Sequence, residues 1–245
     1  MSTPEVAAGA MTPRQLARER TKRELLSVAR RHLREVGPAA LSLRAIAREC
    51  GLVSSAVYRY FESRDALLTV LILEAYDDLG VHAEAAERLV DRGDLGQRFA
   101  RTAQEMRAWA LKNPHQYALI YGSPVPGYAA PQITVPSAAR VGTVLFGILG
   151  DAYASGVRPL VTPALREAGG AVSQLQRDYC PEIPEPVVAL GVESWVRLHG
   201  AISFEVFGQF NQMVASPGDL YAFIIDEELA RLGFGGGAES DGGTP

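Results

Sequence analysis

The sequence has very little cysteine, and its few histidines are scattered. Among 245 residues there are two cysteines, Cys50 and Cys180, which excludes a disulfide framework or a paired-cysteine metal site and fits a reducing compartment. The four histidines have no metal-ligand spacing with one another or with a cysteine pair. We therefore expect no metal, no cofactor and a cytoplasmic location.

Membrane-spanning and catalytic signatures are missing as well. The N-terminal stretch has no apolar run of the kind that a signal peptide needs. The best later candidate for a membrane span, residues 138–156, is interrupted by Arg140 and Asp151. No P-loop, GxGxxG or GxSxG motif stands in a suitable context. We expect neither a membrane partner nor an enzyme active site.

What the sequence does contain is a pair of short helical patterns in residues 41–64, LSLRAIARECGLVSSAVYRYFESR. Apolar residues at helical spacing form two sets, Leu43, Ile46, Ala47 and Cys50, then Val53, Val57, Tyr60 and Phe61. Gly51 lies between the sets and can adopt the positive φ that ends a helix. A short turn containing glycine is the usual joint of a helix-turn-helix.

The second of these helices, residues 54–60, is expected to expose hydroxyls and a guanidinium from Ser54, Ser55, Tyr58 and Arg59. Such groups reach phosphates and base edges. Serines also precede two helices, Ser42 before the first and Ser63 after the hairpin, where they serve as N-caps and leave N–H groups for a phosphate. An ordinary helical hairpin without nucleic acid is the alternative interpretation.

Charge is distributed unevenly along the chain. Residues 1–64 hold 12 Arg and Lys against 6 Asp and Glu, a net +6, whereas the remaining residues hold 12 against 22, a net −10. The basic excess coincides with the hairpin, which favours a polyanionic partner over an inconsequential solvated face.

The same stretch resembles the N-terminal domain of the TetR family of transcriptional regulators. The matching residues are Leu43, Ala45, Ile46, Ala47, Cys50, Gly51, Tyr58, Tyr60, Phe61, Ser63, Arg64, Asp65, Leu67 and Leu68. The sequence departs from the commonest family pattern at Val53, where a capping serine is usual, and at Ser55-Ala56, where Gly-Thr is common. We expect Ser54 to take over the capping.

The resemblance implies a homodimer that places its recognition helices in successive major grooves of a palindromic operator. Expected backbone contacts come from Ser42, Tyr58, Tyr60 and Arg64. Expected base-proximal contacts come from Arg44, Ser55, Val57 and Arg59. For Val57 and Tyr60 the alternative is burial in the core.

The rest of the chain predicts an all-α fold without strands or repeats. We expect a flexible tail over 1–17, the helix-turn-helix domain over 18–64, a larger helical ligand-binding and dimerisation domain over 65–232, and a disordered tail over 233–245. Within the larger domain, helices are expected over 63–90, 95–112, 115–121, 137–156, 187–214 and 220–232. The Pro-rich loop 122–136 is expected to pack over this domain, and the last two helices to form one side of the dimer interface.

One run in the larger domain, Trp195 to Gly200 (WVRLHG), has Trp and His on one helix face. It resembles the WxxxHG signature of one TetR C-terminal subfamily, as does GSPVPGY in the Pro-rich loop. Candidates for a mostly apolar effector pocket are Phe99, Met106, Trp109, Tyr121, Phe146, Trp195 and His199. Plain core packing is the alternative for each.

The sequence thus predicts a ligand-responsive DNA-binding regulator, acting as a repressor that a small apolar effector releases. One alternative is a helical ligand-binding or interaction protein whose basic head contacts a protein or an anionic membrane surface. Another is a helical enzyme that uses His199 with Glu193 or Glu205.

Overall fold

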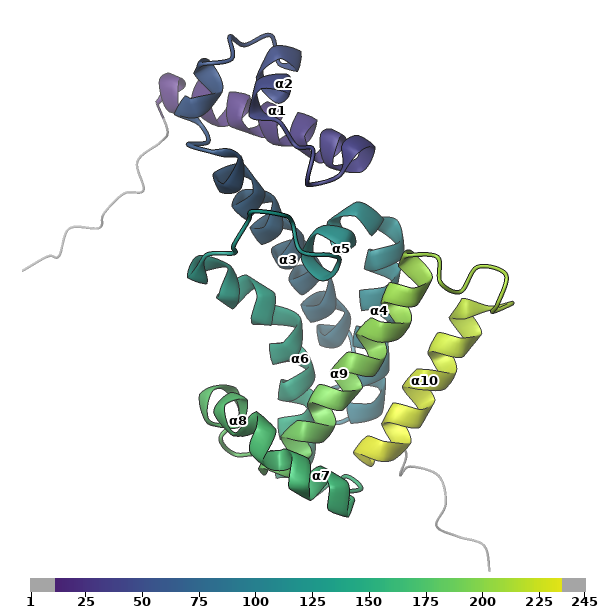
Figure 1. Ribbon diagram of the computed structural model, residues 1–245. Coiled ribbons are helices and arrows are strands. Elements are labelled where there is room, and N and C mark those ends of the chain that lie inside the picture. The colour runs from purple at the N-terminus through teal and green to yellow at the C-terminus, as the bar shows by residue number, and fades with distance from the viewer. Residues whose placement is uncertain (1–11, 235–245) are drawn as a thin grey trace, which may run out of the picture. The chain divides into compact units, whose positions relative to one another are not determined.

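A computed structural model describes residues 12–234 of the chain (Figure 1). Within these residues every regular element is a helix and no strand occurs, which confirms the all-α prediction. The tails expected at the two ends lie largely outside the described residues. The α-helices are α1 (Pro13–Val36), α2 (Leu43–Glu49), α3 (Arg64–Arg88), α4 (Leu95–Lys112), α5 (Pro114–Tyr121), α6 (Val135–Ala154), α7 (Pro163–Ala168), α8 (Ser173–Tyr179), α9 (Glu185–Val206) and α10 (Pro217–Leu232). Three short 3₁₀ helices are η1 (Ala56–Arg59), η2 (Gln132–Thr134) and η3 (Gly169–Val172).

The chain divides into two compact units. Unit 1 comprises the chain up to residue 71 together with residues 124–130, and unit 2 comprises residues 72–123 and everything from residue 131 onward. The division falls inside α3, whereas the sequence placed it at residue 64. The first turns of α3 therefore belong to the helix-turn-helix unit.

In unit 1, α1 begins at Pro13, earlier than the tail boundary expected at residue 17. Its first turn is fully capped: the Thr12 hydroxyl accepts the Gln15 N–H, and the Gln15 side chain accepts the Thr12 N–H. Pro13 at the first helical position has its φ already fixed. The helix buries Leu25, Leu26, Val28, Ala29 and Leu33, whereas Val36 at its end is exposed.

The two predicted serine caps are confirmed. The Ser42 hydroxyl accepts the Ala45 N–H at 3.4 Å, and the Ser63 hydroxyl accepts the Ala66 N–H at 3.0 Å. Between these caps Gly51 adopts the predicted positive φ, 68°, immediately after α2. The helix-turn-helix joint therefore lies where the sequence predicts it.

The second helix of the motif is shorter than expected. Only Ala56–Arg59 is helical, as a single 3₁₀ turn, within the predicted range 54–60. No side chain caps the start of this turn, so the expected capping by Ser54 is wrong. The Ala56 N–H instead donates to the Val53 carbonyl at 2.8 Å. Valine and serine at these positions have low helix propensity, which explains the short turn.

The core of unit 2 forms where α9 packs against α4, α6 and α10, and Figure 1 shows α9 and α10 side by side. Its largest fully buried apolar and aromatic side chains are Trp109, Tyr117, Met106, Ile148, Leu190 and Leu198. A charged group is buried there too. Arg98 is 1% exposed and lies between Glu87 at 2.6 Å and Asp151 at 2.8 Å.

The Pro-rich loop was expected to pack over the larger domain, and this expectation is wrong for its central part. Residues 124–130 belong to unit 1. Val125 is buried, and the Tyr128 hydroxyl lies 3.0 Å from the hydroxyl of Thr69 in the first turns of α3. The turn from Val125 to Tyr128 has Pro126 second and Gly127 third, with φ 76° at Gly127, a pattern typical of a type II turn.

The long helix expected over 187–214 ends at Val206, so its predicted last two turns are wrong. Beyond it the chain turns through Gly208 and Gln212, both with positive φ, of 77° and 64°. A left-handed backbone cannot continue a right-handed helix, and glycine adopts it without steric cost.

By length and composition, the helical stretch Gln132–Ala154 could cross a membrane, with a mean hydropathy of 1.5. Core helices of soluble proteins meet the same criterion. Arg140 in this stretch is held by Glu84 at 2.9 Å and by Asp77 at 3.1 Å, both in the unit 2 part of α3. The expected absence of a membrane partner stays a prediction.

Candidate nucleic-acid interface and effector site

The helix-turn-helix presents most of the predicted DNA-binding side chains to solvent. Ser54, Ser55, Tyr58 and Arg59 are exposed in and before η1, and Arg44 is exposed on α2. Ser42, Tyr60 and Arg64 are half-buried. Val53 is 71% exposed beside them. The exposed group thus combines hydroxyls, guanidinium groups and one apolar side chain, which suits both phosphate and base edges.

Val57 is the exception among these candidates. Its side chain is fully buried, with no exposed surface, in the apolar interior of unit 1. The base-proximal contact predicted for Val57 is therefore wrong, and the alternative of core packing holds. Val53, by contrast, is exposed, so it is the valine of this motif that presents an apolar surface to solvent.

Two arginines hold the motif together through backbone carbonyls. Arg18 on α1 donates to the Arg59 carbonyl at 3.2 Å, where η1 ends. Arg64 donates to the carbonyls of Pro38 and Ala39, at 2.8 and 3.1 Å, in the turn that follows α1. Cations at these positions satisfy carbonyls that helix and turn ends leave open. Arg64 therefore has a structural contact in addition to the phosphate contact predicted for it.

In unit 2, three of the predicted effector residues lie in an aromatic cluster around His199. The His199 ring centroid is 4.3 Å from the Tyr121 ring and 4.3 Å from the Trp195 ring. Tyr117, which the sequence did not single out, stacks on the same imidazole at 6.3 Å, and its hydroxyl contacts Ser203 at 2.9 Å. The spacing of Tyr117 and Tyr121, four residues apart on α5, was the signal that could have found it.

Two polar atoms of this cluster are buried without a hydrogen-bond partner, His199 Nε2 and the Tyr121 hydroxyl. Burial lowers the pKa of His199 from 6.5 to about 4, so the imidazole is neutral at physiological pH. Burial also raises the pKa of the Tyr121 hydroxyl. Most buried polar groups in proteins are satisfied, so these two atoms are exceptions among the described residues.

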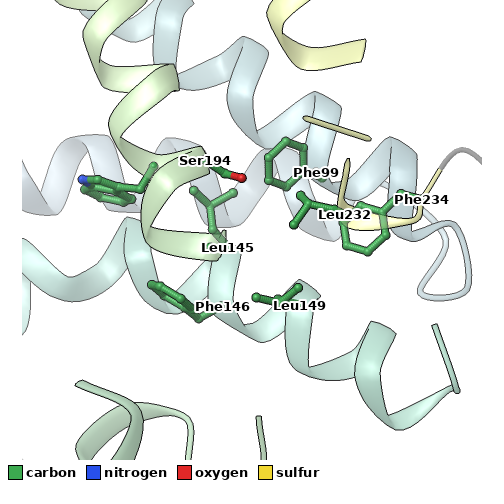
Figure 2. Close-up of a pocket in the computed structure, with 9 residues that line it drawn as sticks. Phe99, Leu145, Phe146, Leu149, Ser194, Leu232 and Phe234 are labelled. Atoms are coloured by element: carbon green, nitrogen blue, oxygen red, sulfur yellow. The ribbon is translucent and has the colours of Figure 1, made fainter. Parts of the chain in front are cut away.

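Trp195 also lines a small apolar pocket, shown in Figure 2. The pocket is narrow, with room for about one water molecule, and Phe99 and Phe146 are among its walls. Its one polar side chain, Ser194, already donates to Glu228. The pocket therefore offers an apolar surface with no charge of its own.

The remaining effector candidates are core residues. Met106 and Trp109 are each 1% exposed and do not line this pocket. The Trp109 indole N–H donates to Asp78 at 2.7 Å, so it has no polar group left for a ligand. For these two residues the alternative of plain packing describes the structure.

The groups proposed for an enzyme do not come together. Glu205 is paired with Arg107 through two hydrogen bonds of 2.7 and 2.6 Å, and Glu193 is paired with Arg231 at 2.6 Å. Neither carboxylate contacts His199. Across residues 12–234 there is no group of three or more His, Cys, Asp or Glu side chains that could hold a metal ion.

An all-α chain with an exposed helix-turn-helix on a basic N-terminal segment, joined to a larger helical unit, has the architecture of a bacterial DNA-binding transcriptional regulator. Comparison with known proteins identifies the family. Residues 25–71 match "Bacterial regulatory proteins, tetR family", and residues 99–227 match "Tetracyclin repressor-like, C-terminal domain". The chain belongs to the TetR family, as a transcriptional regulator and not an enzyme.

Named relatives agree with this assignment. The HTH-type transcriptional regulator Rv1816 of Mycobacterium tuberculosis is 38% identical over 211 residues, which cover 84% of this chain and 89% of that protein. The HTH-type transcriptional regulator Mb1846 of Mycobacterium bovis matches to the same extent. The narrower resemblance to the WxxxHG subfamily stays a prediction.

Solved structures share the fold over most of the chain. The crystal structure of SCO4313 has a TM-score of 0.72 and 31% identity, covering 89% of this chain and 100% of that one. A protein of unknown function from Rhodococcus sp. RHA1 has a TM-score of 0.67 at 22% identity, covering 94% of this chain and 100% of that one; this likeness concerns the fold alone.

Proposed function

We propose that this regulator is a cytoplasmic repressor that binds a palindromic operator as a homodimer and is released by a small, largely apolar effector. The observation that carries the DNA-binding part is the exposed row Ser54, Ser55, Tyr58 and Arg59 at the tip of a segment with net charge +6. Hydroxyls and a guanidinium on a short protruding turn reach phosphates and base edges together.

Dimerisation is supported by apolar side chains that unit 2 leaves exposed. Val196, Phe204 and Phe207 are 60%, 54% and 42% exposed. Val196 and Phe204, eight residues apart, lie on one face of α9, and Phe207 directly follows the last residue of that helix. Gly200 lies on the same face with open space around its Cα. A small residue among exposed apolar ones allows a second helix to approach closely. The dimer would hold two recognition turns about 34–36 Å apart.

The DNA-binding test compares duplexes from the promoter of the protein's own gene with scrambled duplexes at several salt concentrations. We expect a protected palindrome, a preference for it of at least about a thousandfold, and an affinity that falls as salt rises. Equal affinity for both duplexes at moderate salt would contradict the proposal and favour a basic head that contacts a protein or an anionic surface. Transcription from the same promoter should rise when the gene is deleted.

The dimer test uses Phe204→Glu, which places a charge in the centre of the apolar face. Sedimentation should show a dimer for the wild type and a monomer for the variant, with a matching loss of operator affinity. Leu160→Glu is the matched control, since Leu160 is 70% exposed and lies between α6 and α7, off this face. A dimer that survives Phe204→Glu intact would contradict this interface.

A further inference from the structure

Val53 is an apolar side chain placed among the polar side chains that are predicted to contact DNA. It is 71% exposed, whereas Leu16 and Val36, elsewhere in the described part of unit 1, are each 54% exposed. Single exposed apolar residues are common on protein surfaces, so exposure alone gives Val53 no role. Its position is the informative feature, because Ser54 and Ser55 directly follow it and are exposed as well.

The helix-turn-helix has an inner and an outer side at η1. Val57 and Phe61 are 0% and 3% exposed, so they face the interior of unit 1. Tyr58 and Arg59 are exposed, and Val53 is exposed with them. Helical spacing had placed Val53 in the buried set, but the structure places it on the outer side. It therefore lies where a DNA duplex would approach the motif.

The backbone on both sides of Val53 is fixed by hydrogen bonds. The Leu52 N–H donates to the Ala47 carbonyl at 2.9 Å, which closes the end of α2 around Gly51. The Val53 carbonyl accepts the Ala56 N–H at 2.8 Å at the start of η1. Valine also has few side-chain rotamers, because its branched Cβ restricts χ1. This apolar surface is therefore held in place before DNA binds, so little conformational entropy is lost on contact.

An aliphatic side chain suits one feature of the major groove. Thymine alone among the four bases of DNA carries a methyl group there, and each base pair otherwise presents hydrogen-bond donors and acceptors. A valine placed against a donor or acceptor would remove its water without replacing the hydrogen bond, which costs free energy. A valine placed against the methyl group removes apolar surface of both partners from water. The chemistry of Val53 therefore favours a T·A pair at its position.

We propose that Val53 is a specificity-determining residue that contacts the C5 methyl group of one thymine in each half of the operator. It is the apolar member of a set in which Ser54, Ser55 and Arg59 supply the polar contacts. This inference rests on the dimeric, sequence-selective DNA binding proposed above and names one base pair that the protein reads.

The test uses the full-length protein and a duplex that the wild type selects from a random-sequence pool. Each thymine of that duplex is replaced in turn by deoxyuridine, which removes the methyl group and keeps every hydrogen-bonding atom of the base. One such replacement in a half-site should lower wild-type affinity about fourfold, and the same replacement in both half-sites about sixteenfold. Val53→Ser removes both methyl groups of the side chain, so its affinity should not change when those thymines are replaced.

Two further variants serve as controls. Val53→Ile keeps a branched apolar side chain and should keep the dependence on the thymine methyl groups. Val36→Ser changes an exposed valine at the end of α1 in the same unit and should also keep it. The Tm of Val53→Ser should equal or exceed that of the wild type, because an exposed side chain is lost and serine is a good N-cap.

Three results would overturn the inference: no thymine whose replacement weakens wild-type binding, an equal loss in Val53→Ser and the wild type, or a loss of methyl dependence in Val36→Ser as well. An enriched duplex without a methyl-sensitive thymine refutes this inference alone. If the pool yields no enriched duplex, sequence-selective binding is absent, and the proposed function is refuted together with this inference.

Discussion

In unit 1 the polar side chains predicted to contact DNA, Ser54, Ser55 and Arg59, are exposed, whereas in unit 2 the polar side chains Arg98, His199 and Glu228 are buried. The functions proposed for the two units suit this difference. A duplex is a large polyanion that exposed cations and hydroxyls can approach without losing all their water. A small, largely apolar effector, as proposed for unit 2, would give little electrostatic energy, so its site would be mostly apolar.

The largest effect on stability is expected at the buried ion cluster of unit 2, where a charged side chain lies in the core. Arg98→Ala should lower the free energy of unfolding by about 3 kcal/mol, the low end for a broken buried ion pair, because Arg92 still pairs with Glu87 and Asp151 when the buried cation is lost. Urea denaturation measures this loss. Arg101→Ala, an exposed arginine on the same helix, should stay within about 0.5 kcal/mol of the wild type. Similar values for the two variants would contradict the burial of Arg98.

The next effect is a pH dependence that comes from His199. Its folded pKa of about 4 lies below its ordinary 6.5, so between these values the unfolded chain binds a proton that the folded chain does not. Stability contributed by this group is complete above 6.5 and falls by about 3 kcal/mol as pH drops to about 4. The change should be absent in His199→Gln.

The measurement is the urea midpoint of wild type and His199→Gln at pH values on both sides of this window. The difference between the two pH profiles isolates the imidazole, because the carboxylates are common to both proteins. The neighbouring titratable groups on α5, Tyr117 and Tyr121, stay protonated here because burial raises their pKa values. Parallel profiles would show that the pKa of His199 is the same in the folded and unfolded states, which would contradict this prediction.

In unit 1, Arg59 and Arg64 should differ in how they affect DNA binding. Arg59 is exposed at the tip of the motif, so Arg59→Ala should cost about 1–3 kcal/mol at particular base pairs and relax preference there. Arg64→Ala should weaken binding to all duplexes alike and lower the salt slope, and it should also lower the Tm because the carbonyls of Pro38 and Ala39 lose their donor. Binding to a set of single-base operator variants at several salt concentrations separates the two. Equal, sequence-blind losses would contradict this division of roles.

The smallest expected effect concerns residues 124–130, the loop segment that belongs to unit 1. Tyr128→Phe removes the hydroxyl contact with Thr69 and should destabilise unit 1 by about 1 kcal/mol. Hydrogen exchange of the first turns of α3 measures it. Tyr179→Phe, at a tyrosine that is 54% exposed on α8, should leave that exchange unchanged. A loss of protection in both variants, or in neither, would argue against the loop contact.

Much of the fold could be predicted because helix ends are encoded locally. Ser42 and Ser63 cap the helices that follow them, and Gly51 ends α2, as their positions predict. These features depend on residues three or four positions apart, which a sequence displays directly. The long amphipathic helices of unit 2 could also be predicted locally, because their apolar residues recur at helical spacing.

The errors came from contacts between residues far apart in the sequence. The loop 124–130 was assigned to the wrong part of the molecule because its contact with Thr69 joins residues 59 positions apart. Val57 is a different case, because helical spacing had already placed it in an apolar set with Phe61, and both are buried. Val53 of the same set is exposed, so the spacing failed there. Periodicity also gave no sign that Arg98 is buried, since an arginine inside a core depends on acidic partners from other elements.

The loop contact has a consequence for building chimeric regulators. A cut before residue 72 would remove α1, η1 and the start of α3 from Val125 and Tyr128, which belong to the same compact unit. A DNA-binding segment transplanted alone would therefore lack part of its own interior. We expect grafts that also carry residues 124–130 into the recipient to keep more of the donor's thermal stability, so transferable modules in this protein are discontinuous in sequence.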